Sequence, residues 1–186
     1  MKPITWSYSS LDLFKQCPHK YYRMRVKKDI VEPKTPHLDY GLDFHKCAED
    51  FIGLGTPLPE RFSFARAPLE VLKNKAGQHL CEYQLGLTSG LAPCGFKDKD
   101  VWWRGIADLL IINGDKAIVI DYKTGKSAKY ADTKQLEILS LAVFKHFPQI
   151  KKIKSGLLFV VSNEFVRADF AFEDQSIKCS SRKWLG

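Results

Sequence analysis

Two apolar runs joined by a short turn constrain this chain more than any other feature of its sequence. Residues 101–112 read VWWRGIADLLII and residues 116–124 read KAIVIDYKT, and only Asn113, Gly114 and Asp115 separate them. Asn-Gly is a preferred pair in the two-residue turns of β-hairpins, and β-branched residues are enriched in strands. The segment therefore predicts an antiparallel hairpin buried in the middle of a sheet.

Charged residues inside this hairpin need an explanation, because buried charges are costly unless they are paired or bind a metal. With an Asn-Gly loop of two residues, Asp108 lies opposite Val119, and Ile106 lies opposite Asp121. The two aspartates are then diagonal neighbours on one face, roughly 7 Å apart at the backbone. Lys123 follows two residues later on the same face. A loop of four residues would keep this parity, and a loop of three would reverse it.

Two interpretations of this cluster stay open from the residues alone. Two carboxylates a few ångströms apart suit Mg²⁺ or Mn²⁺, which prefer hard oxygen ligands. The alternative is an internal ion pair between Asp121 and Lys123. An ion pair does not require a second aspartate at matching parity, so Asp108 favours the metal site.

The rest of the chain predicts a single α/β domain over residues 1–186. Residues 1–60 carry helical patterns, including a helix over about 38–52, and residues 78–172 form the core. In that core, a helix over 132–147 follows the hairpin, and strands at 155–161 and 165–173 follow the helix. The expected fold is a mixed central β-sheet flanked by helices, with an N-terminal helical segment.

Composition limits the partners and the compartment. The 29 Lys and Arg exceed the 21 Asp and Glu, and a net charge of +8 suits a polyanion such as nucleic acid without requiring one. The five cysteines are odd in number and scattered, which predicts reduced thiols. No window is apolar enough to span a bilayer, and the first residues lack an apolar leader core. We therefore expect a cytoplasmic protein without a membrane partner.

The hairpin motif resembles a known family. The stretch GIADLLIINGDKAIVIDYKTGK is similar to the signature of the PD-(D/E)XK nucleases, with the nearest likeness to the RecB-like and Cas4-like branch. Three further stretches resemble that branch in the same order: SYSSLDLFKQCPHKYY, GLDFHKCAED and KQLEILSLAV. The resemblance extends from about residue 7 to residue 160. It implies a restriction-endonuclease-like core.

The resemblance also implies roles for particular residues. The implied metal ligands are His45, Asp108, Asp121 and the backbone carbonyl of Tyr122. Lys123 would act beside the attacking water, so that Asp108, Asp121 and Lys123 form the catalytic set. The implied or candidate substrate contacts are Gln135, Tyr21, Tyr22, Arg23 and Arg25, and Glu82 is an additional candidate on the preceding strand.

Two departures from the branch affect what can be carried over. Leu139 stands where the branch usually has a tyrosine, four residues after Gln135, which puts substrate handling there in doubt. Many Cas4-like proteins bind an iron–sulfur cluster through one early and three late cysteines, and four thiolates are needed. Cys17 fits the early position, but only Cys179 follows the core. We therefore expect no iron–sulfur cluster.

The implied activity is that of a deoxyribonuclease dependent on Mg²⁺ or Mn²⁺, with an exonuclease favoured. Its substrate would be single-stranded DNA or a duplex end, in repair, recombination, or phage or CRISPR-type DNA processing, including as a phage protein in the host cytoplasm. Two alternatives remain: a catalytically silent DNA-binding module, and a subunit of a recombination complex that needs a partner protein. A hydrolase of another phosphate ester is a more distant one. Two aspartates would repel phosphate in a pure DNA binder, which favours the enzyme.

Overall fold

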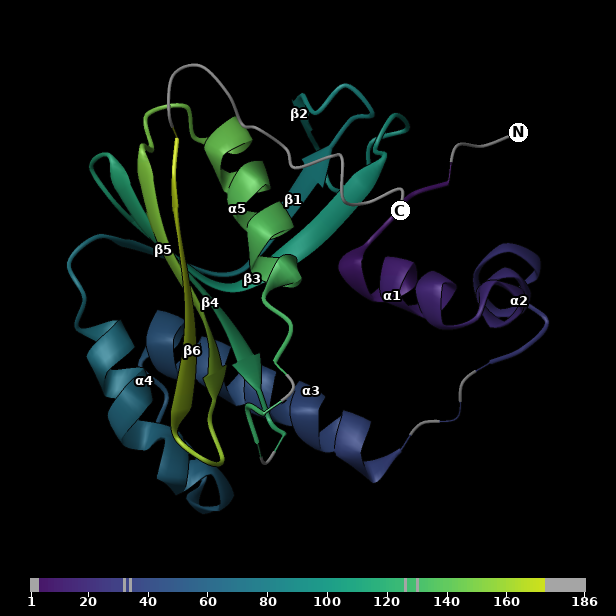
Figure 1. Ribbon diagram of the computed structural model, residues 1–186. Coiled ribbons are helices and arrows are strands. Elements are labelled where there is room, and N and C mark those ends of the chain that lie inside the picture. Colours follow the sequence, from purple (N-terminus) through teal and green to yellow (C-terminus); the bar gives the residue numbers. More distant parts are fainter. Residues whose placement is uncertain (1–3, 32, 34, 126, 130, 173–186) are drawn as a thin grey trace.

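The structure is a computed structural model that describes residues 4–31, 33, 35–125, 127–129 and 131–172. Its centre is a six-stranded sheet with the strand order β2-β1-β3-β4-β5-β6 (Figure 1). The strands are β1 (Gln78–Leu87), β2 (Pro93–Cys94), β3 (Trp103–Asn113), β4 (Lys116–Lys123), β5 (Lys152–Phe159) and β6 (Glu164–Ala171). Strands β4 and β5 are parallel and the other neighbours are antiparallel, which confirms the predicted mixed sheet.

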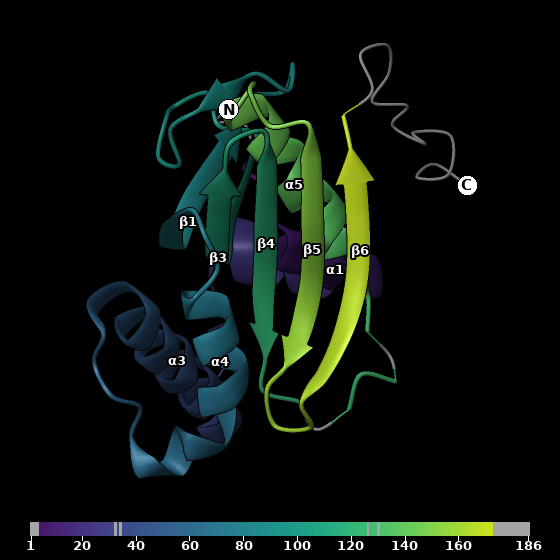
Figure 2. The ribbon, with the colours of Figure 1, turned by 90° about the vertical axis from the view of Figure 1, so that its left-hand side faces the viewer.

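Helices cover both faces of this sheet, with α3 and α4 on one side and α5 on the other (Figure 2). Helix α5 is the crossover between the parallel strands β4 and β5. The helical elements are α1 (Tyr8–Gln16), α2 (Pro18–Tyr21), η1 (Tyr22–Lys27), α3 (Pro36–Glu49), η2 (Asp50–Leu54), η3 (Glu60–Ala65), α4 (Arg66–Lys73) and α5 (Lys134–His146). The predicted α/β class is confirmed. The predicted domain limits at residues 1 and 186 lie outside the described residues.

Two apolar clusters form because neighbouring strand residues point to opposite faces. Leu109 of β3 packs with Phe44 and Leu69 in the cluster under α3 and α4. The next residue, Leu110, packs with Leu139 of α5 on the other face. These five side chains are at most 2% exposed. The central hairpin is therefore covered on both sides, as its continuous apolar runs predict.

The hairpin turn differs from the predicted one by one residue at each end. Asn113 pairs with Lys116, so the loop residues are Gly114 and Asp115. Gly114 has a φ of +60° and Asp115 is not in the left-handed region, a pattern that fits a type II′ turn with glycine first. Asp108 is therefore not opposite Val119, whose partner is Leu110. The shift of two in register keeps the predicted parity.

The N-terminal helices are attached to the sheet through Trp6 and Tyr8. The Trp6 N–H donates to the carbonyl of Trp102 at 2.7 Å, and its carbonyl accepts from the Arg104 N–H at 2.9 Å. Trp6 thereby lies next to the start of β3, in the part of β3 that does not pair with β4. The Tyr8 hydroxyl donates to Asp132, just before α5, at 2.6 Å. These bonds place α1 beside the open end of the hairpin.

The helices in the described ranges are all too short or too polar to cross a bilayer.

Candidate active site

Three carboxylates lie at one level on three neighbouring strands. The pairs between β1 and β3 share one register, in which Glu82 faces Asp108. The register between β3 and β4, continued by one step, places Asp108 against Asp121. Asp108 and Asp121 are only 8% and 4% exposed, and Glu82 is half-buried. We call Glu82, Asp108 and Asp121 the acid row.

The strands change their regular pleat at the acid row. In β3, Ala107 and Leu110 both face α5, although they are three residues apart and should face opposite sides. In β1, Leu80 and Tyr83 show the same shift across Glu82. Glu82 itself has a φ of +48°, a left-handed conformation that costs a non-glycine residue roughly 1–2 kcal/mol. Backbone strain of this kind is typical of functional sites.

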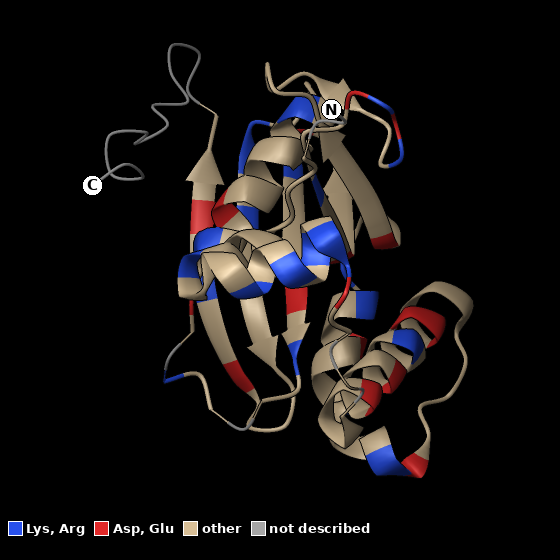
Figure 3. Cartoon of the chain, turned by 90° about the vertical axis from the view of Figure 1, so that its right-hand side faces the viewer, with Lys and Arg blue, Asp and Glu red and all other residues tan. Residues whose placement is uncertain are grey.

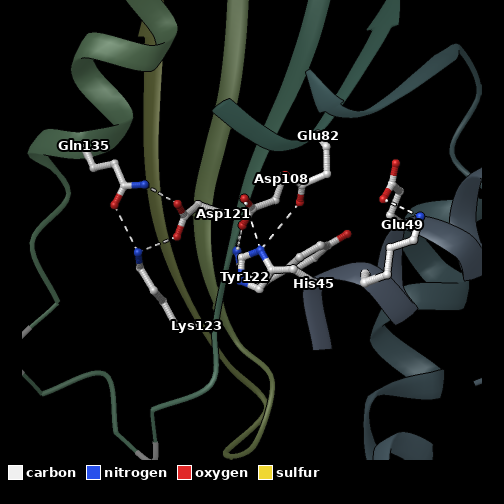
Figure 4. A network of polar contacts seen from close by, with 9 residues as sticks. His45, Glu49, Glu82, Asp108, Asp121, Tyr122, Lys123 and Gln135 are labelled. Atoms are coloured by element: carbon white, nitrogen blue, oxygen red, sulfur yellow. Dashed lines mark hydrogen bonds and ion pairs between the residues drawn. The ribbon is translucent and has the colours of Figure 1, made fainter. Parts of the chain in front are cut away.

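Helix α3 supplies the histidine at one end of the acid row (Figure 4). His45 Nδ1 lies 3.4 Å from Asp108 Oδ1 and 3.6 Å from Glu82 Oε1. The other Asp108 oxygen accepts a 2.6 Å hydrogen bond from the backbone N–H of Tyr122. The Tyr122 ring packs edge-on against His45, with centroids 5.9 Å apart, and fixes the imidazole from the core side.

Helix α5 and the end of β4 supply the polar groups at the other end. Lys123 Nζ lies 2.6 Å from Asp121 Oδ2 and donates to Gln135 Oε1 at 3.0 Å. Gln135 Nε2 donates to the remaining oxygen of Asp121. Asp121, Lys123 and Gln135 therefore form a closed triangle, in which one Asp121 oxygen accepts a hydrogen bond and the other contacts the Lys123 ammonium as an ion pair (Figure 4).

The two ends of the site shift pKa values in ways that follow from their neighbours. Burial alone lowers the pKa of His45, but hydrogen bonding and charge from Asp108 and Glu82 outweigh it and raise that pKa to about 10. Burial and the nearby Asp108 raise the pKa of Asp121, and Lys123 only partly opposes them. Without a metal, a protonated His45 supplies positive charge between two carboxylates, and a cation bound there would replace that proton.

The donor set at the His45 end fits a small divalent cation. One ligand atom each from His45, Glu82 and Asp108 lie within 4.8 Å of one another. An imidazole nitrogen with two carboxylate oxygens suits Mn²⁺, and the oxygens suit Mg²⁺. Asp121, predicted as a ligand, neighbours this group but is engaged by Lys123 and Gln135. Tyr122, predicted to offer its carbonyl, contributes its N–H to Asp108.

The predicted substrate residues of the N-terminal segment lie in different surroundings. Tyr21 is 5% exposed and stacks on Trp6 at a centroid distance of 5.2 Å, so its ring packs inside the helical segment. Tyr22 is 50% exposed. Arg23 binds both oxygens of Asp29, at 2.7 and 2.9 Å. Arg25 is exposed.

Leu139 and Cys17 mark the two departures from the branch that the sequence resembles, and each has a structural role. Leu139 is 2% exposed and packs under the sheet with Trp103, so it belongs to the core rather than to the site surface. Cys17 is exposed and its sulfur accepts from the Lys20 N–H at 3.4 Å, which caps α2. Cys179 lies outside the described residues.

Comparison with known proteins finds a family model and nine similar chains among solved structures. A family model described as "PD-(D/E)XK nuclease superfamily" matches residues 5–169. No curated protein matches the chain. A solved structure titled "Crystal structure of SSO0001" is similar at 14% identity and a TM-score of 0.37, over 90% of this chain. The chain spans 66% of the length of that structure.

Proposed function

The chain belongs to the PD-(D/E)XK nuclease superfamily, and on that premise we propose that it hydrolyses phosphodiester bonds of DNA with Mg²⁺ or Mn²⁺, as an exonuclease. The observation that carries this proposal is the acid row with His45 at one end and Lys123 at the other. A structural ion pair accounts for Asp121 and Lys123, but not for two further carboxylates around a histidine. A DNA-binding surface would also gain nothing from them, because they repel phosphate.

Each side chain of the site has a chemical role in this proposal. His45, Glu82 and Asp108 would hold the cation, with Asp121 completing the negative site. A bound divalent cation would lower the pKa of water and neutralise charge on the phosphate. Lys123, 34% exposed at its side chain, faces solvent as well as Asp121, so it can orient a water and attract the phosphate. Gln135 holds Lys123 and Asp121 in place.

The DNA backbone would approach over the N-terminal helices. Residues 18–28 contain five Lys and Arg and no Asp or Glu. In Figure 3, Lys and Arg gather on the N-terminal helices on the viewer's side of the sheet, and Figure 1 shows α2 farther from the sheet than α1. Of the predicted substrate contacts, Tyr22 and Arg25 are exposed and could contact the DNA strand. Tyr21 is buried and would instead hold the helical segment together.

A cleavage assay with matched variants tests the enzyme. Purified protein is incubated with linear and closed circular DNA in Mg²⁺, Mn²⁺ or EDTA, beside Asp121→Ala and Lys123→Ala. We expect degradation of linear DNA that needs metal and is absent from both variants. DNA binding by the wild type without any cleavage would instead identify a silent binding module. Cleavage that appears only with cell extract would identify a subunit that needs a partner.

The salt dependence of DNA binding tests the approach surface. Changing Arg25 and Lys28 together to alanine should weaken binding to all sequences and reduce the slope of log K against log salt by about 2, because each phosphate contact contributes roughly 1. Lys116→Ala is the matched control, since Lys116 is exposed at the opposite end of β4. An unchanged slope in the double variant would place the DNA on another surface.

A further inference from the structure

A cleft of about 460 Å³ opens next to the His45 end of the acid row, between α3 and the segment after β4. His45 and Glu82 form its inner wall, and Gly41 of α3 and Thr124 form its sides. A Cβ atom at Gly41 would lie 3.5 Å from Thr124 Oγ1, so the lack of a side chain at residue 41 keeps this part of the cleft open. Its volume falls in the range of small-ligand sites.

Two leucines of α3 give this otherwise polar cleft an exposed apolar part. Leu38 and Leu42 are four residues apart on α3 and therefore lie on the same side of the helix. They line the cleft and are 52% and 61% exposed. The site chemistry explains the polar inner wall, but it gives no reason for two exposed leucines beside it. An apolar surface next to a phosphate-binding centre suits the base and sugar of a nucleotide.

The charge along α3 and η2 opposes a continuing DNA strand. Residues 36–54 contain four Asp and Glu and one lysine, a net charge of −3 with histidine counted as neutral, and Arg61 from outside this range binds Asp43 at 2.7 Å. That lysine, Lys46, already binds Glu49 at 3.1 Å and Asp50 at 3.0 Å. A phosphate backbone that ran on past the cleft would therefore follow an acidic surface. A strand that ends in the cleft carries no further phosphates past it.

We propose that this cleft holds the terminal nucleotide of the DNA strand, with its base and sugar on Leu38 and Leu42 and the scissile phosphate at the His45–Glu82 wall. This inference rests on the proposed function and supplies a reason for exonuclease action. In each step water adds to phosphorus, the phosphorus–oxygen bond to one nucleoside breaks, and the released oxygen takes a proton from the water. One nucleoside monophosphate then leaves from the cleft.

Calorimetric titration of dAMP in the presence of Mn²⁺ tests the cleft without any turnover. Leu42→Glu places a negative charge where the nucleotide lies and should weaken dAMP binding about tenfold or more. Gly41→Met fills the cleft sterically and should weaken binding to a similar extent. Leu54→Glu is the matched control, because Leu54 is 77% exposed on η2 and does not line the cleft. It should bind dAMP within about twofold of the wild type, since its charge is remote and screened.

Cleavage assays then separate the cleft from the activity. The wild type should release mononucleotides from linear single-stranded DNA and leave circular single strands intact, and Leu42→Glu should raise KM more than it lowers kcat. If the wild type cleaves no DNA but the dAMP titrations behave as expected, the proposed function fails and the nucleotide site stands. Equal dAMP binding by Leu42→Glu, Gly41→Met and the wild type, no dAMP binding at all, or rapid cutting of circular strands would overturn the inference.

Discussion

The two ends of the acid row are built from the same kinds of atoms but are prepared for different partners. At the α5 end, Asp121 already has an ammonium group and an amide on its two oxygens. At the α3 end, the oxygens of Glu82 and Asp108 share one histidine at 3.4–3.6 Å, longer than a good hydrogen bond. The α5 end is therefore satisfied within the protein, whereas the α3 end has ligand capacity to spare.

Carboxylates in one row can therefore serve two different purposes. Charge that is neutralised by Lys123 serves to position a cationic side chain, and charge that is only weakly neutralised can attract a metal. The two ends are held by contacts from different helices, α3 and α5, so a change at one end should leave the side-chain contacts of the other in place. A variant at the α3 end should mainly change metal affinity, whereas a variant at the α5 end should mainly change the free energy of unfolding.

The largest effect is expected for Asp108→Asn. It removes a carboxylate from the His45 group while keeping an oxygen for the Tyr122 N–H. We expect Mn²⁺ affinity to fall at least about 100-fold, beyond the loss typical of residues that merely support ligands. Cleavage should fall by about 10³. Mn²⁺ titration and single-turnover cleavage measure both. Retention of wild-type metal affinity would show that the α3 end is not the metal site.

Asp121→Asn should reduce Mn²⁺ affinity less than Asp108→Asn does, and it should increase the free energy of unfolding more. Burial and Asp108 raise the pKa of Asp121, so its ionised form is disfavoured in the folded protein. In EDTA at neutral pH, we expect the free energy of unfolding to increase by about 1–3 kcal/mol, measured by urea denaturation.

The pH dependence of this difference carries a definite sign. The folded protein keeps the proton on Asp121 up to a pKa of about 6, against 3.8 for the ordinary group. The stabilisation that this difference gives to the wild type is therefore complete only at low pH. It is lost as pH rises from about 4 to about 6 and is constant above that. The advantage of the asparagine variant should grow over the same window. A constant advantage would contradict the assigned pKa shift.

Tyr122→Phe probes the core behind the α3 end. The Tyr122 hydroxyl is buried, and within the described part of the chain it has no hydrogen-bond partner. Removing an unsatisfied buried hydroxyl should raise the free energy of unfolding by about 1 kcal/mol. Denaturation in EDTA measures the change, with Tyr22→Phe on the exposed residue as the control. A loss of stability would indicate that the hydroxyl has found a partner in solution.

Gly41→Ala has the smallest expected effect. Alanine in the interior of α3 should stabilise the protein by about 0.5–1 kcal/mol, because glycine loses more backbone freedom on folding. The added methyl group meets only Thr124 Oγ1, at an ordinary 3.5 Å. Thermal unfolding with and without Mn²⁺ measures it. A destabilised variant would mean that α3 lies closer to the end of β4 than the structure places it.

The sequence predicted the layers of the fold better than the details of the site. Apolar runs and turn residues indicated the hairpin, and helical periodicity indicated α3 and α5, because burial dictates both patterns. The turn was misplaced because Asn-Gly and Gly-Asp are both good two-residue turns. Only the parity was secure, since a shift of two residues leaves every side chain on its face.

The composition of the site depends on features that no local pattern encodes. Glu82 gains its place from the shift in pleat shared by β1 and β3, and periodicity assumes a regular strand. Tyr21 was predicted to contact substrate because it neighbours basic residues, but Trp6 and Phe14 enclose its ring. The cleft over Leu38 and Leu42 went unpredicted, although two leucines on the exposed side of an acidic helix were a visible signal.

The attachment of Trp6 to β3 has a consequence for how this chain tolerates truncation. Trp6 supplies the main-chain partners that β3 would otherwise lack where β4 diverges from it. A shortened chain that begins at Ser10 would leave those amides and carbonyls of β3 open to another molecule, and unpaired strands of this kind promote self-association. Shortening the amino terminus should therefore produce oligomers before it produces unfolding.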